Sequence, residues 1–282
     1  MKPMRHAIYI ACAALLFCGC STHRDSILKK LDVYKAEFTE WPVHVPTDKT
    51  ADAPLTGNGD IGLTMKTAEE GITFFIGKND FWRALQSYPE GGLALPGALL
   101  LSSDIISTGV YHAEQLPGSA EIRATYTLPE NELSVTAWVS ATDNKVVVEL
   151  ASKKEISLNL AFLPTEDGPL ASVISRGTEE ECSWMTRSFC NNPRLQWDSH
   201  IALALNHTAG PLTLKPGKKE TLVLAVYTNI DTPDWKRKAI MEARNCLDKD
   251  MDSLKREHRL WWSDFWNLSH IDIGDGWMER YY

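Results

Sequence analysis

Glycines at positions 57, 59 and 62 form the one stretch of the chain whose spacing could bind a phosphate group. The spacing matches a dinucleotide-binding loop, which needs a strand just before the loop and a helix just after it. Pro54 disfavours a central strand, and β-prone runs follow the loop at 63–65 and 72–76. The sequence therefore offers no helix N-terminus for a pyrophosphate. It predicts a β-hairpin with its turn at 69–71, in which the glycines allow tight turns and close backbone packing.

Two carboxylates in the same region, Asp60 and Asp80, have the chemistry of a general acid and base. Asp60 lies in a Gly-Asn-Gly-Asp turn, where an aspartate more often accepts hydrogen bonds from neighbouring backbone amides. Lys78, close to Asp80, would keep that carboxylate ionised, which suits a structural ion pair or a base better than an acid. We therefore assign neither residue a catalytic role.

Other catalytic and metal-binding patterns are missing from the sequence. The histidines show no His-x-x-x-His spacing and the cysteines no paired spacing, so the sequence predicts no zinc site and no cofactor. Serine occurs in no Gly-x-Ser-x-Gly motif. Cys182 and Cys190 could form a disulfide in an oxidising compartment or remain free thiols. The net charge of −8 argues against a nucleic-acid partner, which would need a basic stripe.

The N-terminus has the pattern of an export signal. Basic residues precede an apolar run from 7 to 17, which is too short to span a membrane as a stable helix. Gly19 before Cys20 resembles a bacterial lipobox, although Phe17 stands where leucine is usual. We expect a signal peptide over 1–20 and a lipid anchor at Cys20, with the protein in the periplasm or at the outer membrane. An ordinary cleaved signal is the alternative.

Residues 51–230 alternate short β-prone runs with clusters of Pro, Gly, Asn and Asp. Many short strands with regular turn signals predict a mainly β fold, an antiparallel β-sandwich. The preceding segment, 21–50, is expected to be a tether with a short helix before Trp41 and Pro42. The strands expected within the sandwich include 98–101, 121–128, 132–139, 145–150, 157–162, 201–205, 212–214 and 221–227.

A helical pattern replaces the strands after about residue 231, and we expect linker helices over 231–270. From 235 to 266 the chain reads as one long amphipathic helix. Four aromatic residues near its end could form a sugar-binding platform, but their spread over more than one side of the helix favours packing between domains. They are Trp261, Trp262, Phe265 and Trp266. The apolar face is formed by Ala239, Ile240, Ala243, Leu247, Met251, Leu254 and His258.

Three stretches, 57–62, 76–82 and 261–282, together resemble the six-hairpin glycosidase superfamily, in particular secreted bacterial relatives of glycoside hydrolase families 65 and 95. The resemblance rests on the order of the three stretches along the chain, on the Trp-Trp-x-x-Phe-Trp segment and on the Glu-x-Tyr-Tyr segment. It covers nearly all of residues 50–282. It implies a galactose-mutarotase-like supersandwich, a C-terminal linker helix and then an (α/α)6 barrel that carries the catalytic carboxylates. We therefore expect 271–282 to be the start of a truncated barrel.

The resemblance implies the N-terminal part of an exported bacterial glycoside hydrolase that acts on oligo- or polysaccharide and is inactive without its barrel. Its partners would be carbohydrate and a missing or separately encoded barrel, with the membrane contacted through the lipid anchor alone. A stand-alone carbohydrate-binding lipoprotein is the alternative, which the ten tryptophans favour, and a gene fragment without function is a third reading. No catalytic residue is expected in this chain. The residues expected to bind substrate or contact the adjoining domain are Asn58, Asp60, Lys78, Asn79, Asp80 and Trp82.

Overall fold

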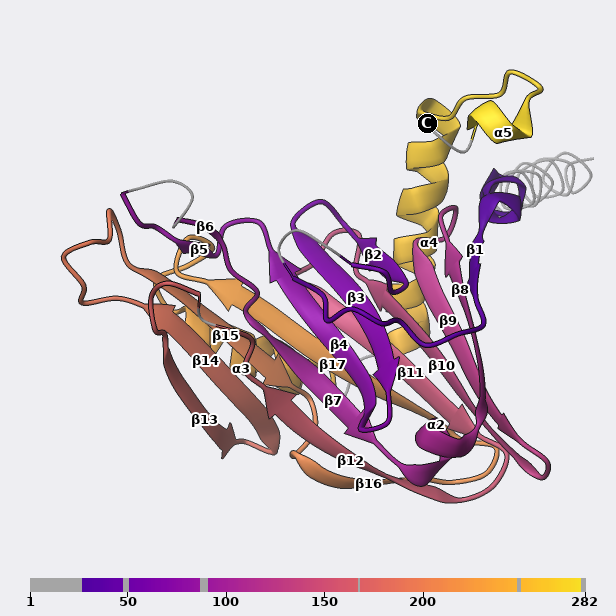
Figure 1. Ribbon diagram of the computed structural model, residues 1–282, viewed down its shortest axis with the longest axis horizontal. Coiled ribbons are helices and arrows are strands. Elements are labelled where there is room, and N and C mark those ends of the chain that lie inside the picture. Colours follow the sequence, from indigo (N-terminus) through magenta and orange to yellow (C-terminus); the bar gives the residue numbers. More distant parts are fainter. Residues whose placement is uncertain (1–26, 48–50, 87–90, 167, 248–249, 280–282) are drawn as a thin grey trace, which may run out of the picture.

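The computed structural model describes residues 27–47, 51–86, 91–166, 168–247 and 250–279. The expected signal peptide and Cys20 lie outside this part of the chain. Within it, two antiparallel sheets pack face to face, which confirms the predicted mainly β, sandwich-like fold (Figure 1). None of the described helices has the length and apolar character needed to cross a bilayer.

The larger sheet has nine strands among the described residues and runs across the full width of Figure 1. Its central strands are apolar on both faces because both faces are covered. On β11, Val146 and Val148 point into the core between the sheets, whereas Val147 packs under the helices on the outside. In spatial order the strands are β1 (Ala36–Phe38), β8 (Val110–Leu116), β9 (Glu121–Leu128), β10 (Asn131–Val139), β11 (Lys145–Ser152), β17 (Lys219–Thr228), β15 (Ser199–Leu205), β14 (Cys182–Phe189) and β13 (Val173–Glu179).

The smaller sheet contains the predicted hairpin. Strands β3 and β4 pair from Ile61 opposite Lys78 to Ala68 opposite Gly71, and Gly71 has a φ of +137° that disfavours any residue with a Cβ. A separate two-stranded ribbon, β5 (Trp82–Arg83) with β6 (Gly92–Leu93), follows it. In spatial order the described strands of the smaller sheet are β16 (Gly210–Leu214), β12 (Ile156–Leu163), β7 (Gly97–Ser102), β4 (Gly71–Lys78), β3 (Ile61–Ala68) and β2 (Leu55–Gly57).

The prediction of one long helix over 235–266 is wrong, because the chain forms two helices there. Helix α3 (Trp235–Asn245) packs on β14, β15 and β17, and α4 (Met251–Leu268) packs on another part of the same sheet, against Trp138. Each helix buries its own short face against different strands, so one straight helix cannot serve both. Asp250 caps the start of α4 by accepting from the Asp252 amide, and Leu247 is exposed between the helices.

Two shorter helices complete the outer parts of the described chain. Helix α2 (Asp104–Thr108) closes one end of the sandwich beside β9, and α5 (Gly276–Glu279) follows α4. Before the sandwich, residues 27–31 are helical and lead into the 3₁₀ turn Asp32–Tyr34. The segment expected to be a tether therefore packs on the protein: Leu28 and its neighbours contact α4, and β1 pairs with β8.

Cys182 and Cys190 do not form a disulfide, and both are free thiols. Cys182 begins β14, and Cys190 comes directly after the last residue of that eight-residue strand. At roughly 3.3 Å per residue along a strand, the two cysteines are far beyond the separation of about 7 Å that a disulfide can bridge. A strand, not a loop, lies between them.

Candidate functional site

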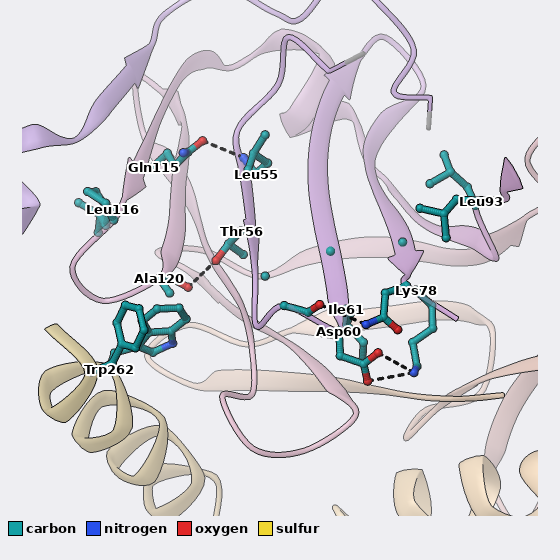
Figure 2. Close-up of a pocket in the computed structure, with 18 of the residues that line it drawn as sticks. Leu55, Thr56, Asp60, Ile61, Lys78, Leu93, Gln115, Leu116, Ala120 and Trp262 are labelled. Atoms are coloured by element: carbon teal, nitrogen blue, oxygen red, sulfur yellow. Dashed lines mark hydrogen bonds and ion pairs between the residues drawn. The ribbon is translucent and has the colours of Figure 1, made fainter. Parts of the chain in front are cut away.

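A pocket of about 710 Å³ lies where the edge of the smaller sheet meets α4 (Figure 2). The glycine loop 57–62 and the end of β4 form one wall, and residues 115–120 form the second. Trp262, Phe265 and Trp266 of α4 form the third. Two stretches that the sequence singled out separately therefore meet at one site.

Strand β2 forms the outer edge of the smaller sheet, and the larger sheet holds it in place. The Leu55 amide donates to Gln115 Oε1 at 3.0 Å, and Thr56 Oγ1 donates to the Ala120 carbonyl at 2.8 Å (Figure 2). Both acceptors lie on β8 or on the loop that joins β8 to β9. These two bonds tie the pocket's sheet edge to its second wall.

The glycine loop is a strand-to-strand turn, as predicted, and its shape depends on Asn58. The Asn58 Oδ1 accepts from the Asp60 and Ile61 amides at 3.0 and 2.8 Å, and its side-chain nitrogen donates to the Ser140 carbonyl at 2.8 Å. Gly59 adopts a φ of +90°, which strains any residue with a Cβ. Asn58 thus shapes the turn and is not among the pocket-lining residues.

Lys78 is the centre of a buried ion-pair cluster at the end of β4. Its side chain is 1% exposed, and its Nζ lies 2.8 Å from Asp60 Oδ1, 3.1 Å from Asp80 Oδ1 and 3.4 Å from Asp231 Oδ1. Burial by itself lowers the pKa of Lys78, but the bonds to the carboxylates outweigh it, so the pKa is raised above its ordinary value. The ammonium is therefore charged throughout the neutral range.

The same cluster joins the two sheets. Asp80 follows β4 of the smaller sheet, and its Oδ2 accepts from Thr228 Oγ1 on β17 of the larger sheet at 2.9 Å. Asp231 Oδ2 accepts from the Thr228 amide at 2.8 Å. The sequence did not identify Asp231 as a partner of Lys78, because an aspartate after a strand is too common to indicate a particular contact.

Asp60 and Asp80 are therefore not arranged as a hydrolytic pair. Glycoside hydrolysis needs one carboxyl group on each side of the sugar, roughly 5–5.5 Å apart in retaining enzymes and about 6.5–9.5 Å apart in inverting ones. Here both carboxylates bind the same ammonium, which leaves no room between them for a sugar ring. Asp60 is also the single carboxylate among the described residues that line the pocket.

The six residues expected to bind substrate or contact a domain fall into two groups. Asp60, Lys78 and Asn79 line the pocket, whereas Asn58, Asp80 and Trp82 do not. Trp82 lies on β5, where its indole nitrogen donates to the Asn79 carbonyl at 2.8 Å. It therefore supports the backbone next to the pocket without reaching into it.

The aromatic wall presents two unpaired hydrogen-bond donors. The indole nitrogens of Trp262 and Trp266 are buried and have no acceptor among the described residues. Phe265 stacks on Trp261 with ring centroids 5.5 Å apart and planes 7° apart, which fixes its orientation. A buried unpaired donor costs about 1–3 kcal/mol, and both nitrogens are enclosed by protein atoms, so a ligand in the pocket does not reach them in this structure.

Helix α4 is held against the sandwich by polar contacts at its buried face. Lys255 pairs with Glu149 of β11, and His258 Nε2 lies 2.9 Å from the Ser119 carbonyl. The His258 ring also packs on Trp138, with centroids 4.6 Å apart. Burial lowers the pKa of His258, so the ring is neutral at neutral pH. These contacts fix the position of the aromatic wall.

A group of possible metal ligands lies elsewhere, on the edge strands β1 and β8. Glu37, His112 and Glu114 have ligand atoms close enough together to share an ion. Lys35 forms ion pairs with both glutamates. Because both carboxylates already bind this ammonium, we assign no metal site there.

No protein-family model and no curated protein matches the sequence. Among solved structures, a putative kojibiose phosphorylase from human microbiome aligns with 83% of this chain and 39% of its own, at a TM-score of 0.49 and 10% identity. A bacterial glucoamylase complexed with acarbose aligns with 82% of this chain and 40% of its own, at a TM-score of 0.39 and 9% identity. The chain thus spans about two fifths of the length of these structures.

Proposed function

We propose that this chain is a glycosidase-related β-sandwich domain that does not cleave glycosidic bonds itself and assembles with a helical catalytic domain. The observation that carries the proposal is the meeting of the glycine loop and the aromatic end of α4 on one surface. The resemblance implies an (α/α)6 barrel after such a linker helix. The barrel, and not the sandwich, would supply the catalytic carboxylates.

The surface for assembly is the exposed side of α4 and the segment that follows it. This part of the chain stands clear of the two sheets in Figure 1. Soluble domains rarely expose so many large apolar side chains together unless the surface meets a partner. The exposed apolar residues here are Leu260, Trp261, Phe265, Leu268, Ile271, Ile273, Trp277 and Met278.

The ion pairs around Lys78 support a non-catalytic role. Both carboxylate oxygens of Asp60 accept hydrogen bonds from the Lys78 ammonium, so they are engaged in a structural ion pair. In the assembled enzyme, Asp60 and Asn79 would lie at the rim of the partner's site and contact substrate without reacting.

The proposal is tested by expressing the chain with and without the helical domain encoded downstream or by a separate gene. We expect the chain alone to release no sugar from α-linked oligosaccharides, with or without phosphate, and the assembled pair to be active. Phe265→Ser should weaken co-purification of the two parts, whereas Val173→Ser, at an exposed apolar residue of the edge strand β13, should not. Sugar release by the chain alone, abolished by Asp60→Asn, would refute the proposal, and so would the absence of any such helical domain.

We also propose that the chain is exported and anchored by a lipid at Cys20. The support is the N-terminal sequence: basic residues, an apolar run and Gly19 before the cysteine. Cys20→Ala should move the protein from the membrane fraction to the soluble fraction, and mass spectrometry of the mature N-terminus should find an acylated cysteine in the wild type. An unmodified mature N-terminus beyond Cys20 would instead indicate an ordinary cleaved signal.

A further inference from the structure

We propose that the pocket between the glycine loop and α4 joins a second hollow beside it to form one binding site for a neutral oligosaccharide. The site belongs to the sandwich domain itself and holds more than one sugar ring. The inference rests on the proposed function for its biological setting and deepens it by naming a ligand for this domain.

The two hollows are neighbours. The second has a volume of about 620 Å³ and lies between residues 31–36 and the segment after α4. It shares Gln115, Pro117 and Trp266 with the first, so Trp266 stands on the wall common to both. Each volume falls within the range of about 300–1,000 Å³ that is usual for small-ligand sites. Two adjoining hollows suit a chain of sugar rings better than a single ring.

The walls match the two kinds of surface on a sugar. The C–H faces of a sugar can pack on the rigid, apolar rings of Trp262, Phe265 and Trp266. Its hydroxyl groups would bond to the amide side chains that line the hollows, those of Gln115 and Asn79. The indole nitrogens of Trp262 and Trp266 are enclosed by protein atoms and supply no contact to the ligand.

Amide side chains supply the polar contacts. The Gln115 side-chain nitrogen, which both hollows can reach, forms no hydrogen bond within the described chain, because only its Oε1 is used by Leu55. Asn79 donates to the Gly59 carbonyl at 3.3 Å and keeps its Oδ1 for a ligand hydroxyl. A few well-placed polar groups in an apolar hollow are typical of sites that orient a small ligand.

The charges around the site favour a neutral glycan over an acidic one. Asp60, Asp80 and Asp231 surround one ammonium, that of Lys78, so the ion-pair cluster beside the first hollow carries surplus negative charge. In the second hollow, Lys35 is already paired with two glutamates. No unpaired cation is therefore offered by the described lining to a uronate or sulfate group.

The test measures binding of tetrasaccharides to the purified full chain by calorimetry and by tryptophan fluorescence. The neutral probes are glucose tetramers with α-1,4, α-1,6 and β-1,4 linkages, compared with glucose and with tetragalacturonate. We expect at least one neutral tetramer to bind about tenfold more tightly than glucose, and tetragalacturonate to bind more weakly than that tetramer.

Variants then locate the site. Trp266→Ala should weaken binding about tenfold or more, and Trp266→Phe should weaken it less, because the phenyl ring keeps part of the apolar surface that packs on the sugar. Asn79→Ala tests the first hollow without disturbing the packing of α4. Trp197→Ala is the matched control, since Trp197 is 47% exposed and lines neither hollow. Circular dichroism shows whether each variant is folded.

With the chain alone, three results would overturn the inference: no neutral tetramer binds at millimolar concentration, glucose binds as tightly as its tetramers, or Trp266→Ala and Asn79→Ala both bind like the wild type. Equal binding of tetragalacturonate would remove the preference for a neutral ligand. These failures leave co-purification with a helical domain unaffected, so they are distinct from failure of the proposed function. If the helical domain prevents sugar binding, the hollow is part of the interface between the two domains, and the inference is wrong.

Discussion

Replacing Lys78 with methionine removes the ammonium from the ion-pair cluster while roughly keeping the volume of the side chain. The substitution therefore isolates the loss of charge from the formation of a cavity. Three carboxylates, from Asp60, Asp80 and Asp231, would then face one another without a cation. Because the cluster joins β4 to β17, we expect the link between the two sheets to weaken.

The size of the effect follows from the distances and the exposure. At 2.8–3.4 Å, each pair gains about 5–6 kcal/mol of Coulomb attraction at an effective dielectric constant of 20, before desolvation and repulsion between the carboxylates are subtracted. Breaking a buried ion pair by removing one partner costs about 3–5 kcal/mol. The carboxylates are 20–34% exposed and can regain water, so we expect the lower end, about 3 kcal/mol.

Urea unfolding followed by circular dichroism measures this loss, and thermal unfolding should show a fall in Tm of roughly 6–12 °C. The control is Lys154→Met, since the Lys154–Glu130 pair is largely exposed and should contribute less than about 1 kcal/mol. Adding Asp60→Asn to Lys78→Met should restore part of the stability, because it removes one of the unpaired charges. A loss equal to that of the Lys154 control, or no recovery in the double variant, would show that the ammonium does not hold the sheets together.

Three further predictions concern the fold. Burial lowers the pKa of His258, so as the pH falls the unfolded chain takes up a proton at this histidine before the folded protein does. The contribution of neutral His258 to stability should therefore be complete above the unfolded pKa of about 6.5, and the free energy of unfolding should decrease as the pH drops from there toward the folded pKa. His258→Gln should flatten that part of the pH profile, and an unchanged slope would contradict the assignment. Gly59→Ala should cost about 1 kcal/mol or more because of the positive φ, whereas Gly62→Ala, at an ordinary φ with open space around it, should be close to neutral in the same urea assay. Alkylation and peptide mapping without reductant should find Cys182 and Cys190 both as free thiols, and a linked peptide would refute the strand geometry.

Local pattern was sufficient to predict most of the strands. Each expected run from 98–101 to 221–227 lies within a described strand, because alternating burial and turn residues leave a signal a few residues long. Strand β13 was not predicted because it is an exposed edge strand with little apolar alternation. Strand β14 was not predicted either. It buries a charged residue, Arg187, whose guanidinium donates to the Ser172 hydroxyl at 2.9 Å and the Glu166 carbonyl at 3.0 Å.

The sequence by itself also determined the hairpin that carries half of the candidate site. Asp60, Lys78 and Asn79 lie at the ends of two strands joined by a tight turn, so their proximity follows from antiparallel register alone. The expected strand-to-strand loop and the ion pair to Lys78 are local features of the same kind. Short-range geometry is sufficient to determine this loop and this ion pair without any tertiary contact.

Only the tertiary structure decided the other half. Trp262 and Trp266 reach the glycine loop because α4 packs across the larger sheet, and Asp231 reaches Lys78 because β17 lies across the core from β4. The break between α3 and α4 likewise depends on which strands each helix covers. Contacts between residues so far apart in the chain depend on how whole sheets and helices stack, and no periodicity within a single segment carries that information.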